Sequence, residues 1–289
     1  MEVAIAAMVV TSAIIHPFWN LLLKKQADLQ LGYLWLTVVL TVCALVHALA
    51  AGSDILAATA VLPLIMLSWG GQILYGTGLT LTLSRGDLSA YYPIIRASPV
   101  FIVVVGVIFL GYSYSWPVLS GIAMAVAGGF LLLYRRGTDY LSDPKTLGLS
   151  LLAMSGTGIY SIADSQLMQK IAPEVQMLWV EALLIPVYVA LFLGRRDHAS
   201  FPGFANPRPA AAGLAMLVVP GIIAYASYYL ILLAFKLGGD VAAVTSVRQA
   251  SIPISVLLGG FFLREGAIMC RLFASMLLAA GIVVIIVTG

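Results

Sequence analysis

The chain has 289 residues, of which 62% are hydrophobic and only 9% are charged. A soluble domain typically carries about 25% charged residues, so this composition excludes an ordinary water-soluble domain and predicts an integral membrane protein. The formal net charge of +3 gives no reason to expect a nucleic-acid partner. Cys43 and Cys270 lie in or beside apolar stretches without further ligands nearby, so no disulfide, metal site or cofactor is expected.

Apolar stretches alternate with short charged or turn-rich segments along the whole chain. A helix needs about 20 apolar residues to cross the hydrocarbon core of a bilayer. Ten stretches are predicted to do so, over residues 3–23, 31–51, 60–83, 88–110, 115–134, 147–170, 174–194, 210–235, 241–263 and 267–288. The sequence therefore predicts an all-α integral membrane protein of ten transmembrane helices, with no soluble domain.

The two halves of the chain are related in sequence. Residues 75–133 align without a gap onto residues 228–286, so that Gly86-Asp87 falls on Gly239-Asp240. Further upstream, His16 and Asn20 fall on Tyr160 and Asp164. A duplicated unit with an odd number of spans must be inverted in its second copy, which is the architecture of many alternating-access transporters. We expect a first repeat over residues 1–134, a linker over 135–146 and a second, inverted five-helix repeat over 147–289.

Basic residues are distributed unequally between the two predicted sides of the membrane. The loops after the first, third, fifth, seventh and ninth spans carry Lys24, Lys25, Arg85, Arg135, Arg136, Lys145, Arg195, Arg196, Arg208, Arg264 and Arg271. The opposite side carries Lys170 and Lys236. Because basic loops favour the cytoplasm, both chain termini are predicted to lie on the non-cytoplasmic side.

Three segments of the chain combine turn residues with polar residues in a distinctive order. They are His16-Pro-Phe-Trp19-Asn20-x-x-x-Lys24, Gly86-Asp87-Leu-Ser-Ala-Tyr-Tyr92-Pro93-x-x-Arg96-x-Ser98-Pro99 and Gly239-Asp240-x-Ala-Ala-x-x-x-x-Arg248-Gln249-x-Ser251. These segments resemble EamA-type carriers of the drug/metabolite transporter superfamily. The resemblance implies a five-plus-five helix carrier in a prokaryotic inner membrane. Two features depart from the family: Gly111-Tyr112 replaces a usual Gly-Glu turn, and the family is often described with cytoplasmic termini.

Two arginines lie inside predicted spans, where a charged side chain is costly unless it faces protein or water. Arg96 and Arg248 occupy near-symmetrical places in the two halves. A planar guanidinium can hold a carboxylate or phosphate through two parallel hydrogen bonds, which predicts that both arginines face one central cavity. The alternative is that each arginine reaches its membrane interface or pairs with a nearby acid.

Other polar and aromatic residues of the same spans complete the predicted site. Tyr75 and Tyr228 are repeat equivalents near the middle of their spans, where a tyrosine is not an interfacial anchor. His16 fits either a structural hydrogen bond or a place in the pathway. The predicted substrate-binding residues are His16, Trp19, Asn20, Tyr75, Tyr92, Arg96, Tyr160, Tyr228, Arg248 and Gln249.

Two acids, Asp164 and Glu181, are the residues predicted to couple proton movement to transport. Ion pairing with Lys170 is the alternative for Asp164, and interhelical hydrogen bonding as a neutral acid is the alternative for Glu181. Spans 115–134 and 267–288 contain Gly121-x-x-x-Ala125-x-x-x-Gly129 and Ser275-x-x-x-Ala279, which predict close packing away from the pathway. Pro99 and Pro253 lie at nearly matching places and mark spans 88–110 and 241–263 as gates.

These features predict a secondary active transporter that works by alternating access as a monomer surrounded by lipid. Its substrate would be a small polar or amphipathic metabolite such as an amino acid, which it would export or exchange. A carrier of lipophilic cations is the alternative, because such substrates would bind the acids and aromatic faces instead. A membrane enzyme or a channel is less favoured, and the chain has neither H-E-x-x-H nor G-x-S-x-G.

Overall fold

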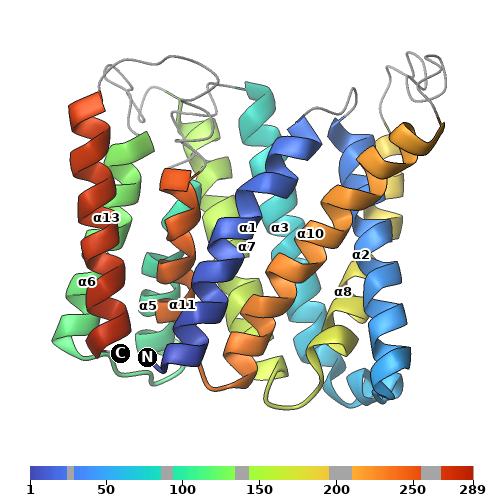
Figure 1. Cartoon of the computed structure of the whole chain (residues 1–289), viewed down its shortest axis with the longest axis horizontal. Coiled ribbons are helices and arrows are strands. Elements are labelled where there is room, and N and C mark those ends of the chain that lie inside the picture. The colour runs from blue at the N-terminus through green and yellow to red at the C-terminus, as the bar shows by residue number, and fades with distance from the viewer. Residues whose placement is uncertain (25–28, 86–93, 134–142, 195–209, 255–267, 289) are drawn as a thin grey trace.

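The computed structural model describes residues 1–24, 29–85, 94–133, 143–194, 210–254 and 268–288, and within these ranges all regular structure is helical (Figure 1). In chain order the elements are α1 (Val3–Lys24), α2 (Leu29–Ala51), η1 (Ile55–Val61), α3 (Leu62–Arg85), α5 (Ser98–Phe109), α6 (Trp116–Leu133), α7 (Pro144–Leu167), α8 (Pro173–Leu193), α10 (Ala210–Lys236), α11 (Val241–Val247), η2 (Arg248–Ala250) and α13 (Ile268–Thr288). The prediction of an all-α protein is confirmed. Both termini lie at the same end of the molecule, and α1 leads away from this end whereas α7 leads towards it.

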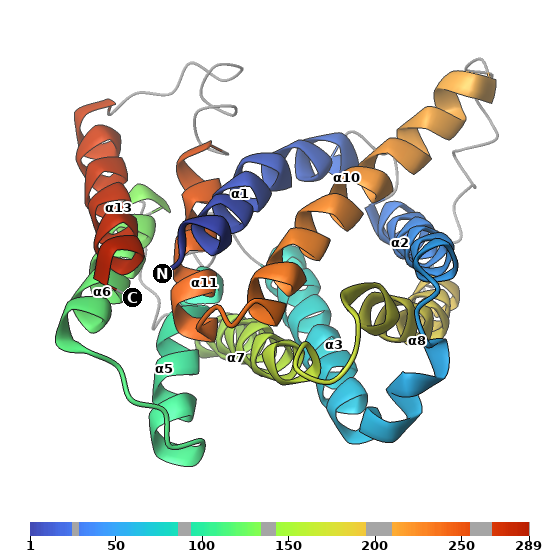
Figure 2. The same cartoon turned by 60° about the horizontal axis from the view of Figure 1, so that its bottom comes forward.

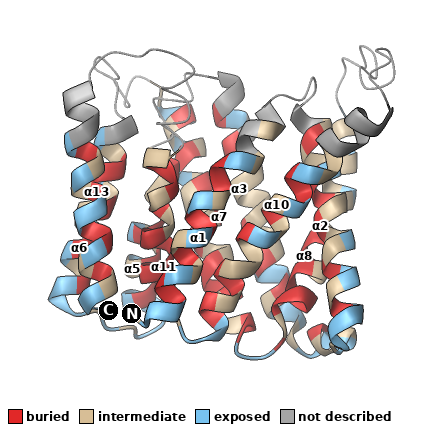
Figure 3. Ribbon diagram, viewed as in Figure 1, coloured by how far each residue is buried: buried red, intermediate tan, exposed pale blue. Residues whose placement is uncertain are grey.

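Five of the described helices are long and apolar enough to cross a membrane, namely Leu31–Ala51, Ile55–Leu79, Pro144–Leu167, Pro173–Leu193 and Leu217–Lys236. Shorter apolar helices cover Val3–Trp19, Ser98–Phe109, Trp116–Leu131 and Phe273–Thr288. Large hydrophobic side chains such as Val46, Leu49 and Phe109 are exposed on the outside of these helices, where exposed residues recur along the ribbon (Figure 3). A surface of this kind is stable against lipid rather than water, which supports a membrane protein. The predicted spans 88–110 and 241–263 lie only partly within the described residues.

Helices α3 and α7 approach each other at glycines. A Cβ atom added to Gly71 would lie 2.7 Å from the backbone nitrogen of Tyr160, and one added to Gly156 would lie 2.4 Å from the backbone nitrogen of Tyr75. These distances are shorter than van der Waals contact, so only glycine permits the observed approach. The close packing holds the Tyr75 and Tyr160 rings side by side, with centroids 6.2 Å apart.

Helices α1 and α10 pack against each other in a similar way, at a pair of serines. The Ser12 hydroxyl donates to the Ser227 carbonyl oxygen at 2.6 Å, and the Ser227 hydroxyl donates to the Ser12 carbonyl oxygen at 3.2 Å. Both serines are buried. Each hydroxyl therefore has a partner where water is excluded, and the two backbones come close together.

Helices α6 and α13 form a pair at one end of the molecule, opposite the end that holds α2 and α8 (Figure 2). The prediction that small residues let two helices pack closely is right about the helices. It is wrong about some of the positions that form the contact. A Cβ atom on Gly128 would lie 2.4 Å from the backbone nitrogen of Leu278, whereas one on Gly129 would lie 2.9 Å from Oε1 of Gln249. Ala279 is exposed. A helical turn has 3.6 residues, so positions spaced strictly four apart drift around the helix. The residues that face the partner helix are therefore spaced sometimes three and sometimes four apart.

The α-helix is interrupted near both arginines. Ala97 forms a turn before α5, and the 3-10 segment η2 follows α11. Pro99 and Pro253 each lack the N–H that would bond the carbonyl four residues earlier, at Ile95 and Gln249. The two prolines that mark the predicted gates therefore lie beside observed breaks in the α-helix.

Candidate functional site

A small polar cavity of about 50 Å³ lies between α1, α3, α7, α11, η2 and the start of α5 with the turn before it. Its described lining residues are His16, Tyr75, Ile95, Arg96, Ser98, Thr157, Tyr160, Thr245, Arg248 and Gln249. Six of the predicted substrate-binding residues thus line one cavity, although they are distant in sequence. A water needs roughly 10–15 Å³ of such space, so the cavity accommodates a few waters or a group of carboxylate size.

The cavity presents more hydrogen-bond donors than acceptors. It is lined by two arginines, and no aspartate or glutamate lies among the described lining residues. Arg248 Nε and Gln249 Nε2 are buried and have no hydrogen-bond partner within the described part of the chain. An unsatisfied buried donor costs about 1–3 kcal/mol, so a bound acceptor would relieve two such penalties at once.

His16 is held in one tautomer by its neighbour on α1. The Trp19 indole Nε1 donates to His16 Nδ1 at 3.2 Å, and the two rings pack edge to face with centroids 5.0 Å apart. An indole can only donate, so His16 Nδ1 must be unprotonated and the neutral ring carries its proton on Nε2. His16 therefore adds another donor to the cavity, and Trp19 positions it rather than lining the cavity itself.

Asp164 lies on α7 outside the cavity, with its side chain completely buried. Ser68 Oγ donates to Asp164 Oδ1 at 2.6 Å, and Gln176 Nε2 donates to the same oxygen at 2.7 Å. Tyr228 Oη donates to Asp164 Oδ2. The donors come from α3, α8 and α10, so one carboxylate joins four helices. Lys170 is exposed, and the three recorded partners of Asp164 are neutral donors.

Tyr228 connects this carboxylate to the polar cavity. The Arg248 guanidinium carbon lies 5.9 Å from the centroid of the Tyr228 ring, within the range of a cation–π contact. Tyr228 thus contacts Asp164 through its hydroxyl and Arg248 through its ring.

The remaining predicted residues lie elsewhere. Glu181 is buried on α8, does not line the polar cavity, and lies one turn before Leu184. The Asn20 side chain and the whole of Tyr92 lie outside the described residues. Sequence reasoning missed Ser68 and Gln176, which bond Asp164. Gln176 could have been found as an uncharged polar residue within a predicted span.

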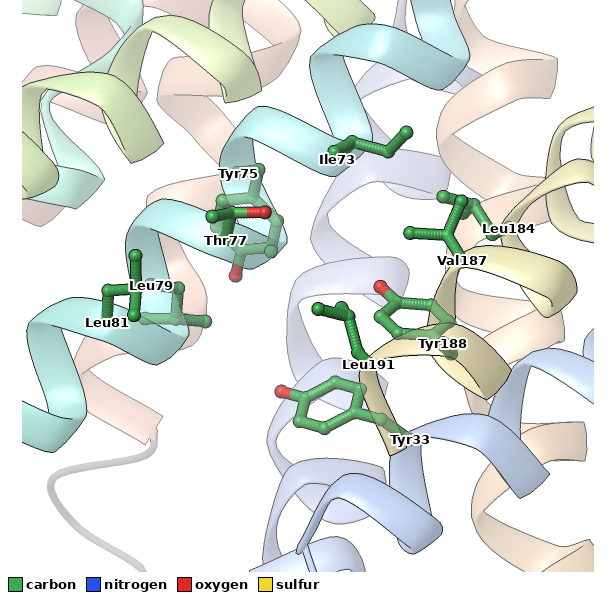
Figure 4. Close-up of a pocket in the computed structure, with 11 residues that line it drawn as sticks. Tyr33, Ile73, Tyr75, Thr77, Leu79, Leu81, Leu184, Val187, Tyr188 and Leu191 are labelled. Carbon is green, nitrogen blue, oxygen red and sulfur yellow. The ribbon is translucent and has the colours of Figure 1, made fainter. Parts of the chain in front are cut away.

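A second, larger pocket of about 280 Å³ lies between α2, α3 and α8 (Figure 4). Leu184, Val187, Tyr188 and Leu191 reach into it from α8, opposite a wall formed by α3. Tyr33 of α2 closes one side. The described lining is aliphatic apart from a threonine and three tyrosines, and Tyr75 lines both this apolar pocket and the polar cavity.

A third cavity, of about 390 Å³, lies beside the chain termini. It is lined by Tyr114, which precedes α6, and by Asp240, which caps α11 by accepting from the Ala243 N–H at 2.8 Å. Asp240 is exposed as a residue, but partial desolvation of its carboxylate in this cavity raises its pKa, and hydrogen bonds from the start of α11 oppose the shift. Burial also raises the pKa of Tyr114, with the charge of Asp240 adding to the effect.

One solved structure, described as "Crystal structure of protein", has the same overall fold. It superposes with a TM-score of 0.69 at 17% sequence identity, and the match covers 98% of this chain and 96% of that chain. No protein-family profile and no curated protein sequence matches the chain. At this identity the similarity concerns the fold alone, and it extends along nearly the entire chain.

Proposed function

We propose that this protein is a secondary transporter built from two inverted five-helix repeats, and that the polar cavity binds an anionic group of its substrate. The observation that carries the proposal is a pair of buried donors, Arg248 Nε and Gln249 Nε2, which have no hydrogen-bond partner among the described residues and lie at a cavity that Arg96 also lines. Bidentate binding of a carboxylate or phosphate by a guanidinium matches this chemistry.

The packing of the helices supports the inverted repeat. The sequence alignment pairs α3 with α10, α6 with α13 and, further upstream, α1 with α7. Exchanging these counterparts converts the α3–α7 contact into the α10–α1 contact and leaves the α6–α13 contact unchanged. The opposite directions of α1 and α7 agree with an inverted relation (Figure 1). Breaks of the α-helix at Ala97 and at η2 fall at corresponding places, as expected of transporters whose discontinuous helices surround a central site.

The same geometry favours an anion over a lipophilic cation. A cationic substrate needs an exposed carboxylate or an open aromatic face. Asp164 is instead occupied by three donors, and neither Asp164 nor Glu181 lines the polar cavity. An amino acid or another small carboxylate is therefore the proposed substrate class.

Uptake into proteoliposomes tests the proposal. We expect the full-length protein to exchange one or more of radiolabelled L-leucine, L-phenylalanine and succinate, with saturation. Arg96→Ala and Arg248→Ala should each abolish this exchange while the folded protein remains in the membrane. Lys236→Ala is the matched control, because Lys236 is an exposed cation away from the cavity. Normal exchange by both arginine variants would refute the anion-binding role, and transport of tetraphenylphosphonium alone would favour the cation carrier.

Asp164 is the proposed site of proton coupling, linked to the cavity through Tyr228 and Arg248. Asp164→Asn keeps the shape of the side chain and removes its charge. We expect this variant to lose accumulation driven by a pH gradient while retaining exchange between equal concentrations. Unchanged pH-driven accumulation would exclude Asp164 as the coupling residue.

The proposed orientation, which follows from the distribution of basic residues in the sequence, places both termini outside the cytoplasm. A reporter that fluoresces only in the cytoplasm should give no signal when fused after Gly289. Bright fluorescence would show the opposite orientation.

A further inference from the structure

We propose that the apolar pocket between α2, α3 and α8 binds the hydrophobic part of the same substrate whose anionic group enters the polar cavity. This inference rests on the proposed anion site and adds a second compartment with its own specificity. It defines the ligand as an amphipathic carboxylate with an aliphatic or aromatic body.

The volumes of the two cavities are the reason for assigning the ionic group of the ligand to one and its hydrophobic part to the other. The polar cavity measures about 50 Å³, a size that suits an ionic group. The apolar pocket measures about 280 Å³, close to the lower limit of roughly 300 Å³ for pockets that bind small molecules. A ligand anchored in the first compartment must place the rest of its atoms outside it, and the second is large enough to receive them.

Tyr75 joins the two compartments. Its side chain lines both, and its ring packs edge to face against Tyr160, which lines the polar cavity. On this proposal, a ligand that contacts Arg248 and Gln249 extends past the Tyr75 ring to reach Leu184 and Val187. Aromatic faces tolerate both aliphatic and aromatic neighbours, so the passage itself does not require polar atoms.

The chemistry of the second compartment points to a hydrophobic group. Leu184 and Val187 face α3 across the pocket, and the hydroxyls of Tyr33 and Tyr188 point into the same space (Figure 4). No described lining residue carries a charge. Burying a methylene is worth about fourfold in affinity, so this pocket would select ligands by the size of their apolar body.

Binding to the full-length protein in lipid nanodiscs, measured by calorimetry, tests the inference. The probes share a carboxylate and differ in body: acetate, 3-methylbutanoate and 3-phenylpropanoate. We expect the wild type to bind the two larger acids at least tenfold more tightly than acetate. The neutral 3-phenylpropanamide should bind at least tenfold more weakly than 3-phenylpropanoate.

Two variants narrow the apolar pocket from opposite walls. Val187→Trp fills it from α8, and Gly76→Val fills it from α3, where a Cβ atom would already lie 3.4 Å from Tyr188 Oη. Both should weaken 3-phenylpropanoate at least tenfold and leave acetate unchanged. Leu193→Trp is the matched control on α8, because Leu193 is 62% exposed and lies outside the pocket, and it should bind all the acids normally.

The outcomes separate this inference from the proposed function. If both pocket variants keep the wild-type preference for 3-phenylpropanoate while Arg248→Ala abolishes binding, the anion site stands and the apolar compartment is refuted. If Arg248→Ala binds every probe normally, the anion site fails, and the two-compartment inference fails with it. Failure of the wild type to distinguish acetate from 3-phenylpropanoate also refutes the second compartment.

Discussion

Gly70 and Gly71 are neighbours on α3 and are predicted to respond in opposite ways to the same substitution. A Cβ atom at Gly71 would lie 2.7 Å from the backbone nitrogen of Tyr160 and 3.0 Å from the Gly156 carbonyl oxygen. A Cβ atom at Gly70 would have no neighbour within 4 Å. Alanine at both positions gains helix propensity, but only Gly71→Ala must push two helix backbones apart.

The expected difference can be estimated from these contacts. Replacing Gly by Ala within a helix stabilises it by up to about 1 kcal/mol. Overpacking typically costs about 1–3 kcal/mol, and the upper part of this range applies where backbone atoms must move. We therefore expect Gly70→Ala to be neutral or stabilising and Gly71→Ala to destabilise the protein by about 1–2 kcal/mol.

Thermal unfolding of the two purified variants in the same detergent measures this difference, with the lower transition temperature expected for Gly71→Ala. The substitution should also weaken binding of 3-phenylpropanoate, because separation of α3 from α7 displaces Tyr75 from Tyr160. Gly148→Ala provides a second control on α7, since its Cβ atom would meet nothing within 4 Å. Equal stability of Gly70→Ala and Gly71→Ala would refute the claim that the glycine contact fixes this helix pair.

Three further outcomes are expected. Tyr228→Phe removes one donor from the buried Asp164 carboxylate and should cost about 1.5–3 kcal/mol of stability, less in a background that already carries Asp164→Asn. Gly128→Leu should separate α6 from α13 and lower the transition temperature, whereas loss of the polar cavity is not expected, because its described lining excludes these helices. Asp240→Asn should retain the helix cap and remove the ionisable group. Desolvation raises the folded-state pKa of Asp240 above its unfolded value, so the protonated form stabilises the wild type at low pH. This contribution is lost as the pH rises. The variant should therefore gain stability relative to the wild type as the pH rises above 3.8, the ordinary pKa of this carboxyl group, and a stability difference that stays constant from below this pH up to neutrality would contradict the assignment.

Helix positions followed from the sequence because a bilayer imposes a minimum apolar length. The span predicted over residues 174–194 is observed as Pro173–Leu193, and that over 3–23 as Val3–Lys24. The 3-10 segment Ile55–Val61 was not predicted as a separate element. Its start depends on a local cap, in which Asp54 accepts from the Leu56 N–H at 3.0 Å, and apolar length carries no information about such a bond.

The candidate site was only partly predictable. Arg96 and Arg248 stood out because a charge within a span requires an explanation, and the structure places both at the polar cavity. Ser68 gave no such signal, because a serine inside an apolar helix can satisfy its hydroxyl with its own backbone. Its role depends on where α3 lies relative to α7, which is set by the contact of nearby Gly71 with a helix distant in sequence.

In the proposed transport mechanism, the two halves of the chain would have similar helix packing but different side chains at the site. Close backbone contacts occur in both the α3–α7 and the α1–α10 pair, at glycines in one and at serines in the other. The aligned side chains differ, however: Arg96 corresponds to Gln249, and His16 corresponds to Tyr160. Similar packing keeps the two conformations of an alternating-access carrier close in energy, whereas a symmetrical cavity would bind a ligand in two equivalent orientations. Placing two arginines off the repeat symmetry, with the apolar pocket on one side, would give an asymmetric substrate a single orientation.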